Sequence, residues 1–251
     1  MTQNERLIYL IQYLLKEHKM TIDIPHTHDE LFQLYRSLVN IRKAYPISQE
    51  FLDIQDEMLK EENQRKGIVS FDHNKDKLII WQGDITRLKV DAIVNAANNQ
   101  MEGCFVVGHQ CIDNAIHTFA GVQLRNDCHR MIEKQGYLER TGKAKITKAY
   151  NLPSQYILHT VGPIVQGQVT KKDELLLASC YESCLRLAIK YQLKTIAFCC
   201  ISTGIFGFPK KEAAQIAINT VLHFIQDHDI KIIFDVFTNE DYIIYEKILN
   251  N

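Results

Sequence analysis

The sequence has no apolar run of about 18 residues, the length that a helix needs to cross a bilayer. It also lacks an excess of one charge, because 29 Lys and Arg residues face 30 Asp and Glu residues and leave a net charge of −1. We find no repeat and no low-complexity segment. These absences exclude a membrane-spanning protein and general nucleic-acid binding, so any anion site has to be local.

We expect no export signal either. The apolar stretch from Leu7 to Leu15 is interrupted by Gln12 and followed by Lys16 and Glu17, without a small-residue cleavage site. Seven cysteines are an odd number, which disfavours a disulfide framework in a chain that is not exported. We therefore predict a cytoplasmic protein whose cysteines serve metal binding, catalysis or core packing.

The first part of the chain has helical periodicity. From about residue 4 to residue 63, apolar residues recur at helical spacing in three groups, namely Leu7, Leu10, Ile11, Leu14 and Leu15, then Leu31, Leu34, Tyr35, Leu38 and Ile41, then Phe51, Ile54, Met58 and Leu59. Asp29 and Ser48 are candidate N-caps. We predict a small helical extension over residues 1–70.

The pattern then changes to short β-branched runs that alternate with helices. We predict strands over residues 77–82, 90–97, 145–150, 156–162, 195–202 and 231–237. We predict helices over residues 111–134, 173–191, 210–227 and 240–249. This alternation indicates a layered α/β domain over residues 71–251 with a largely buried sheet.

Unusual residues follow three of the predicted strands. They are QGDIT at 82–86, NAANNQMEGCF at 95–105 and STGIFGFP at 202–209. Ligands of open α/β sheets bind outside the carboxyl ends of the strands, so we expect these segments to form a single site.

Cys104, His109 and Cys111 lie within one short stretch, GCFVVGHQC. Two thiolates and a neutral imidazole suit Zn²⁺, and three protein ligands leave the open position of a catalytic zinc site. Alternatively, both cysteines are small buried hydrophobes and His109 is a surface loop residue. The other cysteines fit core positions, although one of them or a nearby histidine could complete a closed site.

The segment STGIFGFP could bind an anion. Gly204 and Gly207 lie between a predicted strand and a predicted helix, where backbone N–H groups and the helix N-terminus can cradle a pyrophosphate. An ordinary tight turn would look the same, and the segment is neither a Walker A loop nor a Rossmann fingerprint.

Single polar residues each allow two interpretations. Asp84 can accept a hydrogen bond from a ligand or cap a turn, and Asn95 and Asn98 suit sugar hydroxyls or turns. Phe237 can stack on a base or lie in the core. Asp113 falls in the first turn of a helix, where acids complement the helix dipole, but beside a metal it could take a proton from water.

Taken in order, the segments QGDIT, VDAIVNAAN, CIDNAIHTFAG, GKAKITKAYNLPSQYILHTVGP and STGIFGFP resemble the motifs of the macrodomain, an ADP-ribose-binding fold. Where MacroD-type hydrolases have a glycine run, this chain has GCFVVGHQCIDNAIH, which is similar to the zinc-containing, sirtuin-linked subgroup. The resemblance implies a three-layer α/β/α fold with a mixed central sheet after the helical extension. Asn114 stands where the family has glycine.

The resemblance also implies roles for individual residues. Cys104, His109 and Cys111 would hold one Zn²⁺ ion, and Asp113 and Asn98 would be catalytic. The residues implied in ADP-ribose binding are Asp84, Ile85 and Phe237 near the adenine, Asn95 and Ala97 beside Asn98 at the distal ribose, and Ser202, Thr203, Gly204, Ile205 and Phe206 at the diphosphate.

The implied function is the zinc-dependent removal of mono-ADP-ribose from modified protein side chains, which we expect to be Asp or Glu. The alternatives are a non-catalytic ADP-ribose reader, in which zinc braces a loop, and a deacetylase of O-acetyl-ADP-ribose. The expected partners are ADP-ribose and an ADP-ribosylated protein. In this subgroup the protein can be a lipoyl-carrier protein modified by a sirtuin-like transferase.

Overall fold

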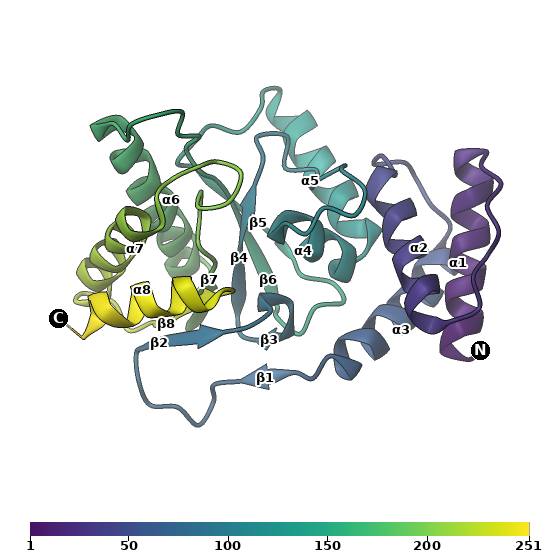
Figure 1. The fold of residues 1–251 in the computed structure, drawn as a ribbon, viewed down its shortest axis with the longest axis horizontal. Helices are drawn as coiled ribbons and strands as arrows, with labels where there is room; N and C mark the ends of the chain where they lie inside the picture. Colours follow the sequence, from purple (N-terminus) through teal and green to yellow (C-terminus); the bar gives the residue numbers. More distant parts are fainter. Residues whose placement is uncertain (251) are drawn as a thin grey trace.

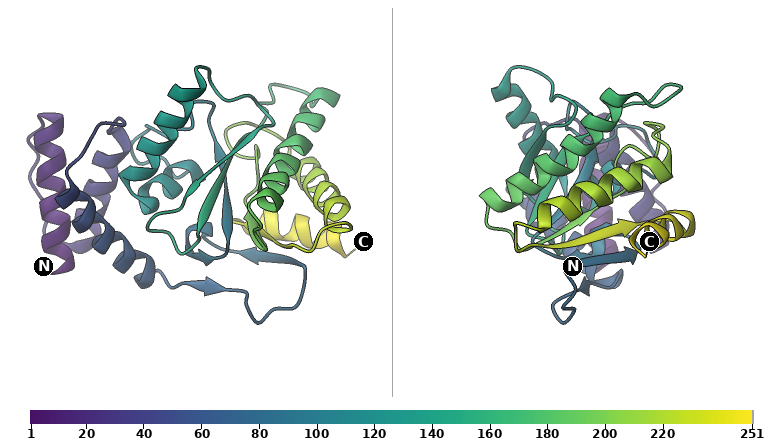
Figure 2. Two further views of the ribbon diagram at one scale, coloured as in Figure 1. Left: turned by 180° about the vertical axis from the view of Figure 1, so that it is seen from behind. Right: turned by 90° about the vertical axis from the view of Figure 1, so that its left-hand side faces the viewer.

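The computed structural model describes residues 1–250, in which a twisted sheet lies between two layers of helices (Figure 1). One face of the sheet is covered by α4 (Ile112–Ala120) and α5 (Val122–Gln135). The other face is covered by α6 (Lys171–Lys190), α7 (Lys210–Ile225) and α8 (Asn239–Leu249), as the view from behind also shows (Figure 2). The predicted three-layer α/β/α macrodomain fold is confirmed.

The main sheet has the strand order β2-β8-β7-β4-β6-β5. Its strands are β2 (Leu78–Gln82), β4 (Ala92–Ala97), β5 (Ala144–Lys148), β6 (Tyr156–Val161), β7 (Thr195–Phe198) and β8 (Lys231–Val236). Neighbouring strands are parallel except β5, which runs antiparallel to β6. The carboxyl ends of the parallel strands therefore meet at one edge, the place where ligands of such sheets bind. A separate small sheet pairs β1 (Val69–Ser70) with β3 (Leu88–Lys89).

The predicted helical extension forms three helices, α1 (Gln3–His18), α2 (His28–Ile41) and α3 (Gln49–Arg65). They lie on the far side of α4 and α5 from the sheet (Figure 1), and α2 and α3 contact α4. Phe32 of α2 stacks on Phe119 of α4 with ring centroids 5.5 Å apart. The division into residues 1–70 and 71–251 stays a prediction.

Of the two predicted helix N-caps, one is confirmed and one is wrong. Ser48 caps α3 as predicted, because its side chain accepts a hydrogen bond from the amide of Phe51. Thr27, and not Asp29, caps α2 by accepting from the amide of Glu30. Asp29 lies inside the first turn, where its charge complements the helix dipole. No helix of residues 1–250 is both long and apolar enough to span a membrane.

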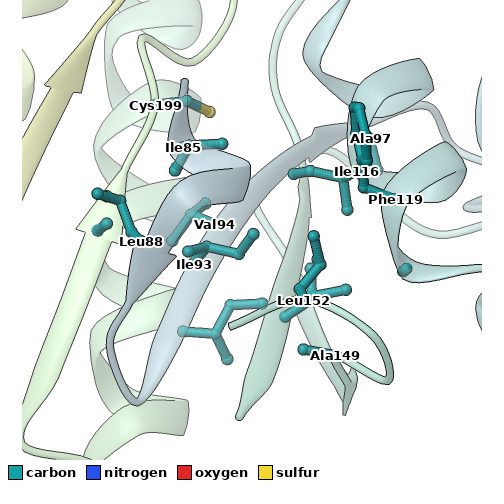
Figure 3. Packing of buried hydrophobic residues seen from close by; sticks show 14 of the residues in the cluster. Ile85, Leu88, Ile93, Val94, Ala97, Ile116, Phe119, Ala149, Leu152 and Cys199 are labelled. Atoms are coloured by element: carbon teal, nitrogen blue, oxygen red, sulfur yellow. The ribbon is translucent and has the colours of Figure 1, made fainter. Parts of the chain in front are cut away.

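The core surrounds β4. Ile93 and Val94 of this strand pack in one buried cluster with Ile116 and Phe119 of α4 and with Leu152 (Figure 3). Four of the cysteines predicted to be core residues are buried, namely Cys128, Cys180, Cys184 and Cys199, and Cys200 is partly buried. The apolar face of α4 is therefore anchored to the sheet, and the residues at its N-terminus are held in place.

One helix expectation was wrong. The sequence predicts a single helix over residues 111–134, but the structure has α4 and α5 with a break at Gly121. The φ angle of Gly121 is +99°, which no helix allows and which L side chains rarely adopt. A Cβ atom there would lie 2.6 Å from Gln55 Nε2. The side chain of Gln55 is buried, and its Oε1 atom accepts hydrogen bonds from the hydroxyl of Tyr35 and from the backbone amide of Val122.

We predict that Gly121→Ala lowers the free energy of unfolding by about 3 kcal/mol, since it strains the backbone and disrupts the buried amide of Gln55. Gly136→Ala is the matched control, because Gly136 also has a positive φ but a Cβ atom added there would meet no atom within 4 Å. The control should lose only about 1 kcal/mol, because Gly136 has the left-handed conformation (φ 78°, ψ 6°) that L residues can adopt, whereas Gly121 (φ 99°, ψ 169°) lies in a region that is nearly restricted to glycine. Urea unfolding of both variants measures the difference, and equal losses would contradict this explanation.

Candidate functional site

A cavity of about 690 Å³ opens at the carboxyl edge of the sheet, a volume typical of ligand sites. Segments that follow β2, β4, β6, β7 and β8 form its walls. Of the residues predicted for the site, the cavity is lined by Asp84, Ile85, Asn98, Cys104, His109, Cys111, Asp113, Ser202, Thr203, Gly204, Ile205, Phe206 and Phe237. The three strand-end segments therefore meet in one place.

Asn95 and Ala97 lie behind the cavity wall and not in it. Both are buried, and Ala96 between them lines the cavity instead, because successive side chains of a strand point to opposite faces. The direct ribose contact predicted for Asn95 and Ala97 is therefore corrected. The side chain of Asn95 reaches Asp113, and Ala97 belongs to the core.

Asp113 is the buried acid of the cavity. Its Oδ1 atom accepts a hydrogen bond of 2.8 Å from Asn95, and its Oδ2 atom accepts a longer one of 3.4 Å from Asn98. Burial raises the pKa of Asp113 to about 6. The carboxyl group is thus held at a fixed orientation beside the cavity, with a proton affinity close to that which general acid–base catalysis requires.

A hydrogen-bond chain behind Asp113 fixes Asn95. The amide of Asn95 lies 3.1 Å from Nδ1 of His159, the residue paired with it on β6. Nε2 of His159 lies 2.9 Å from the hydroxyl of Thr147 on β5. Burial lowers the pKa of His159 to about 3, so its ring is neutral and has one donor and one acceptor for these two partners.

The predicted metal ligands converge on one point. The side-chain donor atoms of Cys104, His109 and Cys111 all lie within 4.8 Å of one another, and Cys104 Sγ is 3.3 Å from His109 Nδ1. Burial raises the pKa of the Cys111 thiol to about 12. A buried thiol is deprotonated when a metal ion binds to it, and this donor set of two sulfurs and one nitrogen fits zinc.

A second group of buried donors also lies within 4.8 Å, namely His117, Cys128 and His159. It fits a metal poorly, because both ring nitrogens of His159 already have the partners Asn95 and Thr147. The ring nitrogens of His117 have no hydrogen-bond partner among the described residues, and Nε2 lies 3.6 Å from Asp113 Oδ1.

The loop of residues 202–206 offers free donors. None of the amide groups of Thr203, Gly204, Ile205 and Phe206 donates to another described residue. The loop is closed instead by the amides of Gly207 and Phe208, which donate to Gly204 and Ser202. Free amides at a strand end, ahead of the N-terminus of α7, form a cradle for an anion.

Known proteins are similar to this chain in sequence and in fold. The Macro domain family profile matches residues 94–217. A protein-ADP-ribose hydrolase of Treponema medium is 50% identical over 261 residues, covering 100% of both chains. The Oceanobacillus iheyensis macrodomain solved with ADP is 40% identical with a TM-score of 0.64 and covers 70% of this chain and 92% of that one. The chain belongs to the macrodomain family.

A further solved structure, the Trypanosoma brucei macrodomain in complex with ADP-ribose, is 29% identical with a TM-score of 0.65. The match covers 85% of this chain and 94% of that chain, and so extends beyond the residues that the family profile matches. Several residues that line the cavity of this macrodomain lie outside the profile's range, namely Arg36 from the N-terminal helix α2, Asp84 from the segment after β2, and Asp235 and Phe237 from the end of β8 and the segment after it.

The end of the cavity around Asp84 is one such place. Asp84 caps the short helix η1 (Ile85–Arg87) through Oδ1, and its Oδ2 atom pairs with Lys66 at 2.6 Å. Burial opposes ionisation, but the Lys66 ammonium and hydrogen bonds from Thr86 outweigh it, so the pKa of Asp84 lies below its usual value. Asp84 is thus a charged acceptor at the cavity wall, held there by the end of the extension.

Four residues in or next to the cavity of this macrodomain were not among the predicted site residues. Arg36 of α2 and Asp235 of β8 line the cavity, and Lys66 and Asn40 contact residues that line it. Burial raises the pKa of Asp235 well above its usual value, and its Oδ1 atom has no partner among the described residues. A carboxyl residue inside the apolar run KIIFDVF was the available signal for Asp235. No local sequence pattern indicated that Arg36, Lys66 or Asn40 belongs to the site.

Ser202 adopts a strained conformation in the anion cradle. It is buried with a φ of +66°, and its hydroxyl has no partner among the described residues. Its neighbour Thr203 has an ordinary φ and donates its hydroxyl to the carbonyl of Cys200 at 3.0 Å. Strain and unpaired polar groups of this kind concentrate at ligand sites.

We predict that Ser202→Gly raises the free energy of unfolding by about 1 kcal/mol, because relief of the positive φ and removal of the unpaired hydroxyl outweigh the chain entropy that glycine adds to the unfolded state. Thr203→Gly, one residue further on, should lower it by about 1 kcal/mol, since it loses a hydrogen bond and gains chain entropy in the unfolded state. Thermal unfolding of both variants without ligand is the measurement. A destabilised Ser202→Gly variant would contradict the strain argument.

Proposed function

We propose that this macrodomain hydrolyses the bond between ADP-ribose and a modified protein side chain, with Asp or Glu as the linked residue. The relatives from Treponema medium and Staphylococcus aureus, 50% and 47% identical, are both named protein-ADP-ribose hydrolase, which confirms the prediction of an enzyme of this class. The observation that carries the proposal is the position of Asp113, a buried carboxyl group that lines the same cavity as the thiol and imidazole donors.

The binding part of the cavity holds the ligand at both ends. The free amides of residues 203–206 suit the diphosphate, and the Asp84 carboxylate suits the amino group of the adenine. Phe237 is 76% exposed at the cavity wall and offers a ring for stacking. Anchoring these groups places the distal ribose near Asn98 and Asp113, and a fixed geometry of this kind supplies much of an enzyme's rate.

The catalytic part of the proposed site consists of Asp113 and the two side chains that bond its carboxyl group, Asn95 and Asn98. Asp113 accepts a proton from the attacking water, while Asn95 and Asn98 hold its two oxygen atoms in place. The water oxygen bonds to the anomeric carbon of the distal ribose as the bond from that carbon to the side-chain carboxyl oxygen breaks, and the free Asp or Glu carboxylate leaves. Cys104, His109 and Cys111 would hold one Zn²⁺ ion. When bound, the ion would supply Lewis-acid chemistry, by acidifying a water molecule or polarising a ribose oxygen.

The reader alternative needs the cradle and Asp84 but gives no reason to bury a carboxyl group at the ribose end of the cavity. Burying a charge is costly unless a function or a partner requires it. We extend the proposal to the expected partners, which are ADP-ribose and an ADP-ribosylated protein, and the resemblance to the sirtuin-linked subgroup offers a lipoyl-carrier protein modified by a sirtuin-like transferase as a candidate. A cytoplasmic location belongs to the same proposal.

The test is the release of ADP-ribose from an ADP-ribosylated protein, measured with untreated, chelated and zinc-reconstituted enzyme and with Asp113→Asn. We expect chelation and the substitution each to lower the rate about 100-fold or more. Added zinc should restore the chelated enzyme. Asp229→Asn, an exposed carboxylate paired with Lys77 away from the cavity, is the control and should keep the full rate.

The outcomes separate the candidate functions. Equal rates in all samples would show that neither zinc nor Asp113 is catalytic. An untreated protein that binds ADP-ribose in calorimetry but releases none from the modified protein would be a reader. Release of acetate from O-acetyl-ADP-ribose, without activity on the modified protein, would assign the deacetylase function.

A further inference from the structure

The loop of residues 102–111, which we call the metal loop, makes few hydrogen bonds of its own. Within residues 1–250, its one internal backbone hydrogen bond joins the amide of His109 to the carbonyl of Val106 at 3.2 Å. Side chains from other segments instead donate to its carbonyl groups. These donors are Arg125 to Glu102 at 2.7 Å, Asn98 to Gly103 at 2.9 Å, Asn40 to Cys104 at 2.6 Å, Asn114 to Val106 at 3.4 Å and Arg36 to His109 at 3.4 Å.

Two of these donors, Arg36 and Asn40, come from α2 in the N-terminal extension. They lie four residues apart and therefore share one face of the helix. Each bonds the carbonyl of a predicted metal ligand, Asn40 that of Cys104 and Arg36 that of His109. Helix α2 thus holds the backbone at two of the three predicted ligands.

Asn114 joins α2 to the site. Its side chain is buried, donates to Asn40 Oδ1 at 2.7 Å and accepts from Arg36 at 2.9 and 3.1 Å. Its backbone amide donates to Cys111 Sγ at 3.4 Å, so the same residue also contacts the third predicted ligand. A glycine at position 114 would lack every one of these side-chain bonds.

Arg125 of α5 couples the end of α2 to the start of the metal loop. Its Nη1 atom donates to the carbonyls of Val39 and Asn40 at 2.8 and 3.0 Å, and also to that of Arg42. Its Nε atom donates to the carbonyl of Glu102, and its guanidinium lies 4.4 Å from the ring centroid of Phe105. A displacement of α2 would therefore be transmitted to the loop.

We propose that α2 is a positioning element of the metal site, in which Asn40 and Arg36 hold the metal loop in the conformation that gathers its three donor side chains. This inference rests on the zinc site of the proposed function. Residues behind metal ligands orient them, and their loss commonly lowers metal affinity about 10- to 100-fold. The N-terminal helices thus complete the site in addition to adding buried surface.

Asn40→Ala tests the proposal against Asn63→Ala as the matched control. Asn63 lies on α3, is 3% exposed compared with 2% for Asn40, and donates to the carbonyl of Asn151 at 2.8 Å. Asn63→Ala removes one buried hydrogen bond between the extension and the rest of the chain, and Asn40→Ala removes two, the one to the carbonyl of Cys104 and the one from the side chain of Asn114. Only Asn40 bonds the metal loop.

We expect Asn40→Ala to lower zinc affinity about 10-fold or more in competition with a chromogenic chelator, while Asn63→Ala binds zinc like the wild type. Hydrogen exchange of the His109 amide, which donates to Val106 within the metal loop, should be faster in Asn40→Ala alone, with and without zinc. The kcat of Asn40→Ala should fall while its KM for the modified protein changes little. Both variants should lose thermal stability, and Asn40→Ala should lose more because it removes two hydrogen bonds where Asn63→Ala removes one.

Arg36→Met is a second variant with little risk of misfolding, because Arg36 is only half-buried. It should also speed exchange of the His109 amide. Unchanged exchange and zinc affinity in Asn40→Ala and Arg36→Met, relative to Asn63→Ala, would overturn the proposal. If the wild type binds no zinc and releases no ADP-ribose, the proposed function fails, and exchange of the zinc-free loop still decides whether α2 holds it.

Discussion

The metal loop depends on hydrogen bonds that it receives from side chains elsewhere, since within residues 1–250 only one backbone bond lies inside it. An open stretch of backbone has many conformations of similar energy, and each external bond removes some of them. The donors come from α2, α4, α5 and the end of β4. The geometry of the site is therefore a property of the whole assembly, and the sheet, its helical cover and the N-terminal extension are all needed to form it.

Parallel pairing brings the other half of the site to the same place. Asn95 and His159 are register partners on β4 and β6, and Asn95 in turn bonds Asp113 at the start of α4. The sheet thus sets the position of Asp113. The helices outside the sheet set the position of the three predicted metal ligands, Cys104, His109 and Cys111. Rigid elements on both sides of the cavity are what a precise site requires, because loops alone vary more in position.

The sequence predicted the six strands of the main sheet, because a sheet buried on both faces requires continuous apolar runs. It also predicted a site at the ends of the strands, because polar residues that can bind a ligand follow those runs. It did not predict the break at Gly121 or the burial of Asn95, which depend on a backbone angle and on the face that a strand presents. Asn40 and Cys104 are 64 positions apart. No local pattern encodes which distant side chain bonds a given carbonyl group. The sequence therefore predicts α2 as a helix of the extension but does not predict its contacts with the metal loop.

The most direct test of this account is the anomalous diffraction of a zinc-loaded crystal with ADP-ribose. We predict one zinc peak bound to Cys104, His109 and Cys111, with no fourth protein ligand and with the distal ribose between the ion and Asp113. A peak among His117, Cys128 and His159 would contradict the account. So would a fourth protein atom on the ion or an empty metal loop in an active crystal.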